Sequence, residues 1–181
     1  MGQDMKEIFE EKLKKKLGSS YSLEWDTDKK GVVFGWCKLA NAEDIKYVAE
    51  AVAEYKGRVM TISPLITTNE NRTAEHVEIC YHLYFEGVNF TAQATLPEGE
   101  KKVVSITPIL KSADWHEREM QELYNLQLAG HPNPERLFLS TDIPWTDKTM
   151  IPLSEALNGA STNTLWEKIM DSRSGEAKAD E

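Results

Sequence analysis

The chain has 181 residues, 40% of them hydrophobic, which is enough for one well-packed domain followed by a tail. Its formal net charge of -9 argues against docking on nucleic acid or anionic lipid, where basic residues supply most of the affinity. It contains no apolar run of about 18 residues, so we expect no membrane-spanning helix.

Two amphipathic helices are predicted in the first third of the chain, because apolar residues recur there at spacings of three and four. The first covers residues 4–17 and ends at Gly18. The second begins after Asn41, which we expect to act as its cap, and ends before Gly57. The lysines of the first helix are balanced by glutamates, so we expect it to pack on a core and not on a membrane surface.

Alternating apolar and polar residues predict a set of strands. Their ranges are 21–26, 32–39, 59–66, 77–85, 89–96 and 103–109. A short turn at Glu86 and Gly87 joins two strictly alternating runs and predicts an antiparallel hairpin. Pro64 lacks a backbone donor, which predicts an edge strand or a bulge. The fold class is therefore α+β: a mostly antiparallel sheet with two helices packed on it, a short signature helix and an extended C-terminal arm.

Residues 113–139, A-D-W-H-E-R-E-M-Q-E-L-Y-N-L-Q-L-A-G-H-P-N-P-E-R-L-F-L, form the most specified stretch of the chain. Asp114 and Glu117 have the spacing of a capping box, which predicts that a helix begins at Trp115. Asn125 tolerates a positive φ and is expected to end that helix after about three turns.

The helical wheel of this short helix predicts which residues face the core. Its apolar face contains Trp115, Met120, Leu123 and Tyr124, and its polar face contains Glu117, Arg118 and Gln121. Glu119 falls inside the apolar stripe, where a carboxylate is costly without a partner. We expect that partner to be Arg136, across the Gly130-His131-Pro132 turn, or else backbone amides of the turn. On this basis Glu119→Ala should loosen the loop and weaken assembly.

These residues resemble the signature W-x-E-R-E, G-H-P and R-x-L of the 30 kDa subunit of respiratory complex I, a domain that also occurs in energy-converting NiFe hydrogenases and membrane-bound sulfur-reducing complexes. The signature set is Trp115, His116, Glu117, Arg118, Glu119, Tyr124, Gly130, His131, Pro132, Arg136 and Leu137. The chain departs from the complex I branch at Tyr124-Asn125, where Phe-Gly is usual, and at residues 151–156, where Ile-Pro-Leu is followed by Ser-Glu-Ala and not by a charged triplet. The first departure keeps an aromatic residue and a left-handed stop, and the second favours the hydrogenase-like branch.

The resemblance implies a non-catalytic, soluble subunit of a membrane-bound, ion-translocating redox complex. Such a subunit docks on the large hydrogenase-like (49 kDa-like) subunit, beside the iron-sulfur small subunit, at the cytoplasmic face of the cell membrane, and reaches antiporter-like membrane subunits only indirectly. It holds no cofactor itself, whereas its partners hold the NiFe or quinone site and the iron-sulfur clusters. Glu119 and Arg136 would hold the Gly-His-Pro loop, and Trp115, Tyr124 and His131 would supply contact area.

The domain organisation follows from the position of the signature and the composition of what comes after it. Residues 1–139 form the domain similar to the 30 kDa subunit. Residues 140–171 have isolated apolar anchors and are expected to form an arm, which either lies on a partner or folds back. Residues 172–181 are small, polar and charged, and disorder is expected there.

Three other interpretations remain open at this stage. Within the family, the chain could belong to a NADH- or ferredoxin-quinone oxidoreductase. A hairpin carrying Tyr81, His82 and Tyr84 could instead be a platform for single-stranded RNA. A stand-alone enzyme would use His116 and Glu119 as acid and base.

The two cysteines, Cys37 and Cys80, have no C-x-x-C spacing and are expected to be buried thiols, neither cluster ligands nor a disulfide. Cys80 and His82 are the best local pair of metal-ligand types, and we expect them not to bind a metal.

Overall fold

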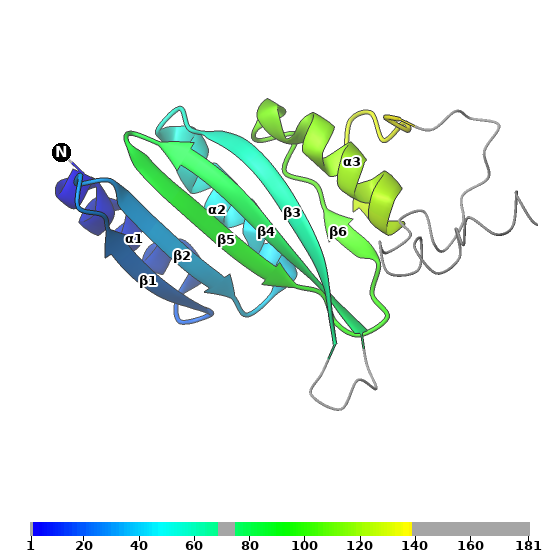
Figure 1. The fold of residues 1–181 in the computed structure, drawn as a ribbon, viewed down its shortest axis with the longest axis horizontal. Helices are drawn as coiled ribbons and strands as arrows, with labels where there is room; N and C mark the ends of the chain where they lie inside the picture. Colours follow the sequence, from blue (N-terminus) through cyan, green and yellow to red (C-terminus); the bar gives the residue numbers. More distant parts are fainter. Residues whose placement is uncertain (1, 69–74, 139–181) are drawn as a thin grey trace, which may run out of the picture. The chain divides into compact units, whose positions relative to one another are not determined.

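A computed structural model of the chain describes residues 2–68 and 75–138 (Figure 1). The predicted arm, residues 140–171, and the predicted disordered tail, residues 172–181, lie outside the described residues. Within residues 2–68 and 75–138, no helix combines the length and the apolar character needed to cross a membrane.

The described residues form three α-helices, seven strands and two short 3-10 turns. In chain order these are α1 (Gly2–Leu17), β1 (Tyr21–Thr27), β2 (Val33–Leu39), η1 (Ala42–Asp44), α2 (Ile45–Glu54), β3 (Arg58–Thr68), β4 (Glu75–Phe85), β5 (Val88–Thr95), β6 (Lys102–Val104), η2 (Lys111–Ala113), α3 (Asp114–Tyr124) and β7 (Gln127–Ala129).

The main sheet has the order β1-β2-β5-β4-β3, and all neighbouring pairs are antiparallel except β2 and β5. The predicted α+β class is confirmed. β4 and β5 form the predicted hairpin, in which Glu86 and Gly87 both adopt positive φ at the turn. Pro64 lies in β3, which is an edge strand, as its missing amide predicts. The register of β3 shifts elsewhere, between Val59 and Thr61.

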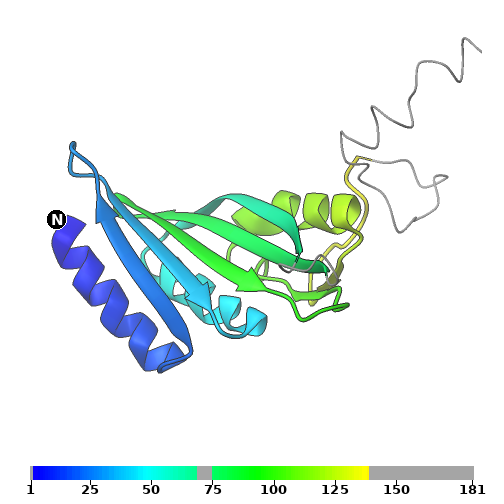
Figure 2. The same ribbon diagram turned by 60° about the horizontal axis from the view of Figure 1, so that its bottom comes forward.

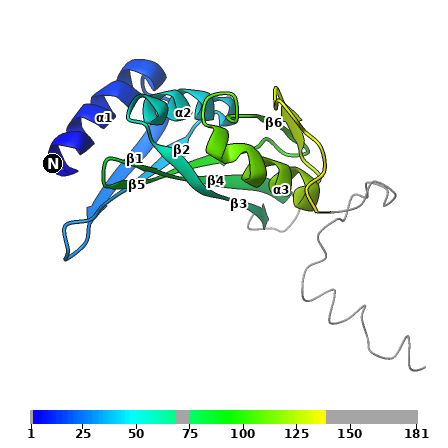
Figure 3. The ribbon, with the colours of Figure 1, turned by 90° about the horizontal axis from the view of Figure 1, so that it is seen from above.

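Helices α1 and α2 cover one face of this sheet, and Figures 2 and 3 show both helices on the same side of the strands. The core lies between these two layers. At its centre the ring of Phe9 in α1 lies 4.3 Å from that of Phe85 and 5.0 Å from that of Phe90. All three rings are at most 1% exposed, and full burial of each contributes about 1.5–3 kcal/mol.

The lysine-rich side of α1 is tied to α2 by ion pairs. Lys12 pairs with Glu54, and Lys16 Nζ lies 2.6 Å from a carboxylate oxygen of Glu50. The expectation that this helix packs on the protein is confirmed.

Two local expectations need correction. The predicted strand at 103–109 stops at Val104, because Thr107 to Ile109 form a turn whose start is bonded to α3. The second helix is preceded by the 3-10 turn η1, and Asn41 forms no side-chain cap. The short strand β6 pairs in parallel with β7, so the segments before and after α3 lie side by side.

Candidate functional site

α3 is the helix that carries the family-like signature, and it begins one residue earlier than predicted, at Asp114. Its N-cap position is Ala113, so the predicted capping box is wrong. Glu117 does not cap the helix, because its carboxylate accepts hydrogen bonds from the turn after β6. The predicted stop is confirmed, since Asn125 has φ 51° and ψ 43° in the left-handed region.

The buried face of α3 differs from the predicted one. The buried residues of the helix are Glu117, Met120, Gln121 and Glu122, three of which are polar. Trp115 is 65% exposed, so its assignment to the inner face is wrong, as is the assignment of Glu117 and Gln121 to the outer one. The apolar pattern failed because this helix packs against polar backbone, where carboxylates find hydrogen-bond donors.

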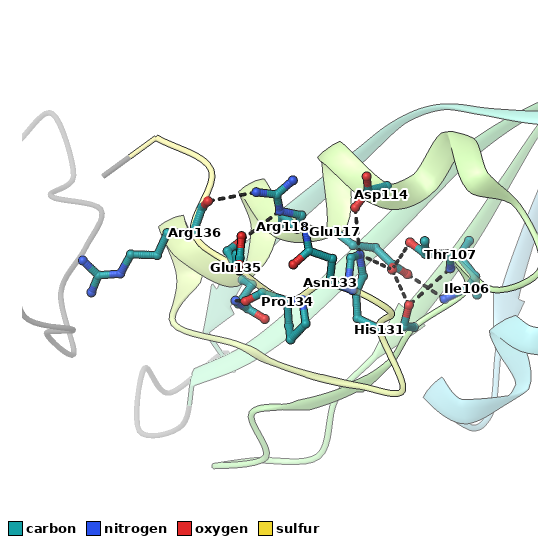
Figure 4. A network of polar contacts seen from close by, with 12 residues as sticks. Ile106, Thr107, Asp114, Glu117, Arg118, His131, Asn133, Pro134, Glu135 and Arg136 are labelled. Atoms are coloured by element: carbon teal, nitrogen blue, oxygen red, sulfur yellow. Dashed lines mark hydrogen bonds and ion pairs between the residues drawn. The ribbon is translucent and has the colours of Figure 1, made fainter. Parts of the chain in front are cut away.

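Glu117 is fully buried and accepts three hydrogen bonds from the turn after β6 (Figure 4). Its two carboxylate oxygens receive the Ser105 hydroxyl at 2.5 Å, the Ile106 amide at 2.7 Å and the Thr107 hydroxyl at 2.6 Å. Bonds to a charged acceptor are worth about 1.5–3 kcal/mol each, which offsets the cost of burying the charge. The carboxylate therefore fastens α3 to the strand that precedes it.

His131, from the Gly-His-Pro turn, is buried on the other side of this carboxylate. Its Nδ1 accepts a 3.0 Å hydrogen bond from the amide of Asn133, so the ring proton sits on Nε2. Nε2 lies 3.2 Å from Asp114 Oδ1 and 3.7 Å from Glu117 Oε2. His131 thus packs between the turn and α3 with its Nε2 forming no hydrogen bond to a described residue, and only 8% of its surface is exposed as potential contact area.

Tyr81 adds a neutral group to the same buried region. Burial, together with the negative charge of Glu117, raises the pKa of Tyr81 well above its usual range. The side chain therefore stays a protonated phenol at neutral pH. Because Tyr81 is fully buried, it does not share a surface with His82 and Tyr84, so the alternative of an RNA platform made by these three residues lacks one of its aromatic rings.

The next two turns of α3 hold the loop of residues 134–138 through its backbone. Arg118 donates from Nε to the carbonyl of Glu135 at 2.8 Å and from a terminal nitrogen to that of Arg136 at 2.9 Å. Gln121 donates to the carbonyl of Pro134 at 2.8 Å.

Glu122 holds the same loop as an acceptor, whereas Arg118 and Gln121 hold it as donors. We call these hydrogen bonds to residues 134–138 the α3 clamp. Glu122 Oε2 accepts the amide of Leu137 at 2.9 Å and that of Phe138 at 2.8 Å. Among the hydrogen bonds and ion pairs of residues 2–68 and 75–138, those that hold this loop come from Arg118, Gln121 and Glu122, and the predicted pair of Glu119 with Arg136 is not among them. Figure 4 shows the Arg136 side chain directed away from the network.

The sequence does not predict four residues of the site, Ser105, Thr107, Gln121 and Glu122. One sequence feature points to the first two, the Ser-Ile-Thr segment within an otherwise apolar run. Hydroxyl groups on both sides of an isoleucine can interrupt a strand and supply hydrogen-bond donors.

The site is a buried polar network in which the oxygens of Glu117 are fully used, whereas the Tyr81 hydroxyl, Asp114 Oδ1 and His131 Nε2 are buried without a hydrogen-bond partner among the described residues. Every oxygen of Glu117 is used by the protein itself, and the site has the character of a structural clasp. His116 and Glu119, the acid and base of the alternative in which the chain is a stand-alone enzyme, are joined by no hydrogen bond or ion pair in the part of the chain that the structure describes. Among the same residues, no three side chains of His, Cys, Asp or Glu gather as a metal site would require.

Comparison with known proteins decides the family. The model of the family described as "Respiratory-chain NADH dehydrogenase, 30 Kd subunit" matches residues 39–163, which is more than half of the chain. The chain belongs to this family. The resemblance seen at the signature residues is therefore confirmed, and the match includes all of α3 and its loop.

Curated members of the 30 kDa subunit family match over shorter segments. A subunit of the NADH-quinone oxidoreductase of Rhodopseudomonas palustris is 40% identical over 65 residues, which are 35% of this chain and 32% of that protein. A subunit of the NAD(P)H-quinone oxidoreductase of a Synechococcus species is 41% identical over 49 residues, 27% of this chain and 26% of that protein. The matched segments thus span about a third or less of these relatives.

Two solved structures share the fold of this family member. A trypsin-resistant fragment of Nqo5 is 22% identical with a TM-score of 0.53, covering 71% of this chain and 98% of the fragment. A chain of the archaeal membrane-bound sulfane sulfur reductase is 13% identical with a TM-score of 0.60, covering 86% of this chain and 91% of that chain.

Proposed function

We propose that this protein is a non-catalytic, peripheral-arm subunit of a membrane-bound, ion-translocating redox complex. It docks on the large hydrogenase-like subunit, next to the iron-sulfur small subunit, at the cytoplasmic face of the membrane. The NiFe or quinone site and the iron-sulfur clusters belong to those partners, and antiporter-like membrane subunits are reached through them. Family membership supports the class of complex.

The observation that carries the docking role is the clamp of α3 on the loop at 134–138. Arg118 and Gln121 hold three consecutive carbonyls, and Glu122 holds the next two amides. A loop with so many bonds to a helix has lost most of its conformational freedom before it meets a partner, which reduces the entropy cost of binding.

The same end of the domain presents large apolar side chains to solvent. Trp115 is 65% exposed and Phe138 is 60% exposed, although both flank the buried network. Rigid aromatic residues at the rim of an ordered loop are typical anchors of protein interfaces. We infer that this end of the domain, and the arm that continues from it, supply the contact area.

Among complexes of this class, we propose a membrane-bound hydrogenase or a sulfur-reducing relative. The Ser-Glu-Ala segment at 154–156, where the complex I branch has charged residues, supports this choice. The alternative is a NADH- or ferredoxin-quinone oxidoreductase, in line with the names of the curated relatives.

Purification from native membranes in a mild detergent, through a tag on this chain, tests the proposal. Mass spectrometry should identify a hydrogenase-like large subunit, an iron-sulfur subunit and antiporter-like subunits, and metal analysis should find iron. Nickel would assign the complex to the hydrogenases, and iron without nickel to a sulfur-reducing or quinone-reducing complex. A metal-free protein that purifies alone would contradict the proposed function.

A further inference from the structure

The face of the main sheet opposite α1 and α2 contains a hollow of about 770 Å³, and its lining includes none of the residues of the α3 clamp. Residues of all five strands line it, among them Glu24, Asp26, Phe34, Trp36, Met60 and Thr91. A hollow of this volume is within the range of ligand-sized pockets.

Large apolar side chains point into solvent at this hollow. Phe34 and Trp36, on the same side of β2, are 43% and 42% exposed, and Met60, at the bulge of β3, is 41% exposed. Trp36 stands opposite Glu24 of β1 and Thr91 of β5, so it has a neighbouring strand on each side. Exposed apolar groups gathered at one hollow mark a binding surface.

The Trp36 ring is held in one orientation by a relay across three strands. Its Nε1 donates a 3.0 Å hydrogen bond to the amide oxygen of Gln93, and Nε2 of Gln93 donates at 2.9 Å to Glu78. The carboxylate of Glu78 thus fixes the amide, and the amide fixes the indole. A surface aromatic ring ordered in advance loses less entropy when a ligand stacks on it.

The charge at the hollow has one sign. Glu24 and Asp26 are the charged side chains of the lining, which includes neither lysine nor arginine. On the neighbouring positions of the strands, Lys38 of β2 and Arg58 of β3 are cationic but do not line the hollow. Arg58 already lies 5.9 Å from the ring centroid of Tyr84. Carboxylates beside an exposed indole face attract a cation, since the π face carries negative electrostatic potential.

We propose that this hollow binds a lysine or arginine side chain carried by an apolar segment of a partner protein. The cation lies over Trp36 near Glu24 and Asp26, and the neighbouring apolar side chains cover Phe34 and Met60. Residues 139–181 of the chain itself contain four Lys or Arg and eight Asp or Glu, so they match this site poorly. A second copy, with a net charge of -9, is disfavoured by the same repulsion.

This inference rests on residues that the proposed function does not use, so each can fail without the other. The first test uses the full-length chain labelled with nitrogen-15 and two capped tetrapeptides. One peptide has the order leucine-arginine-alanine-leucine, and the other has glutamine in place of the arginine. The readout is the indole N–H resonance of Trp36, which is assigned by its loss in Trp36→Phe.

The arginine peptide should shift the Trp36 resonance in a saturable way, with an affinity at least about fivefold higher than that of the glutamine peptide. The double variant Glu24→Gln with Asp26→Asn should lower the affinity for the arginine peptide by about fivefold or more. Its charge-matched control, Glu11→Gln with Glu98→Gln, changes exposed acids elsewhere and should leave the affinity unchanged. Equal affinities for the two peptides, or equal effects of the two double variants, would overturn the proposal.

A second test identifies the natural occupant in the assembled state. A photo-cross-linking amino acid is placed at Met60 of the chain in native membranes. It should react with a segment of another protein that has Lys or Arg within about four residues of the cross-linked position. Cross-links to residues 139–181, to a second copy of this chain or to an acidic segment would each contradict the inference.

Discussion

Glu117 Oε1 accepts a 2.7 Å hydrogen bond from the backbone amide of Ile106, although both groups are fully buried. This bond joins the first turn of α3 to the end of β6. Ser105 and Thr107 donate to the same carboxylate from either side of Ile106. The Glu117 carboxylate thus binds groups that a neighbouring strand would bind if β6 continued. This explains why β6 ends at Val104.

The first prediction concerns this carboxylate. Glu117→Gln puts an amide donor in place of one of two oxygens that each accept from the protein, and should lower the free energy of unfolding by about 2–3 kcal/mol. Glu119→Gln, two residues along the same helix and partly exposed, should change it by less than about 0.5 kcal/mol. Urea unfolding of both variants measures the difference. Equal stability of the two would show that Glu117 is not the anchor of α3.

The second prediction concerns the loop. The sequence predicts that Glu119 holds the loop that follows α3, whereas the hydrogen bonds to residues 135–138 come from Arg118 and Glu122. Arg118→Lys should lose one of the two carbonyl bonds, because an ammonium group cannot reproduce the guanidinium fork, at a cost of about 1 kcal/mol.

Hydrogen exchange gives the readout for Arg118→Lys. The amides of Leu137 and Phe138, next to the released carbonyls, should exchange faster, while β4 and β5 keep their protection. The matched control is Arg58→Lys, a change of the same kind on β3, which should leave the loop untouched. Unchanged exchange in the loop of Arg118→Lys would refute the clamp.

The third prediction is a pH dependence. Burial raises the pKa of Cys37 to about 12, whereas a thiol in the unfolded chain titrates near 8.5. The folded state therefore keeps a proton that the unfolded state releases. The resulting stabilisation is complete below about pH 8.5 and is lost as pH rises toward 12, by at most about 1.4 kcal/mol per pH unit.

Comparing wild type with Cys37→Ala isolates that contribution. Urea unfolding from about pH 7 to about pH 10 should give a shallower loss of stability in the variant. Tyr81, whose pKa is raised by burial and by the charge of Glu117, remains in both proteins and so cancels in the comparison. Parallel pH profiles would show that Cys37 titrates normally in the folded protein.

The fourth prediction concerns close packing at Gly35. A β-carbon there would lie 2.6 Å from ring atoms of both Phe90 and Trp25, which is far inside van der Waals contact. Gly35→Ala should therefore lower the free energy of unfolding by about 1–3 kcal/mol through overpacking. Ser22→Ala, at an exposed position of the neighbouring strand β1, is the control and should change it little. Thermal unfolding distinguishes them, and an unchanged midpoint for Gly35→Ala would contradict the packing described.

Much of the fold could be predicted from local signals in the sequence. Period-two alternation located the β4–β5 hairpin, and the missing amide of Pro64 placed β3 at an edge. The left-handed tolerance of Asn125 marked the end of α3 to the residue. Such features depend on backbone conformation within a few residues, so they are legible without knowledge of the fold. The spaced signature also identified the family correctly.

The arrangement of the site was decided by tertiary structure. The helical wheel placed Glu117 and Gln121 in solvent and Trp115 inside, and the structure reverses both assignments. A wheel assumes that apolar residues are buried against an apolar surface. α3 instead lies between two stretches of backbone, one before it and one after it in the chain, whose free amides, hydroxyls and carbonyls come together only when the chain has folded. Buried carboxylates are stable there because those donors converge on them, and no local pattern in the sequence encodes that convergence.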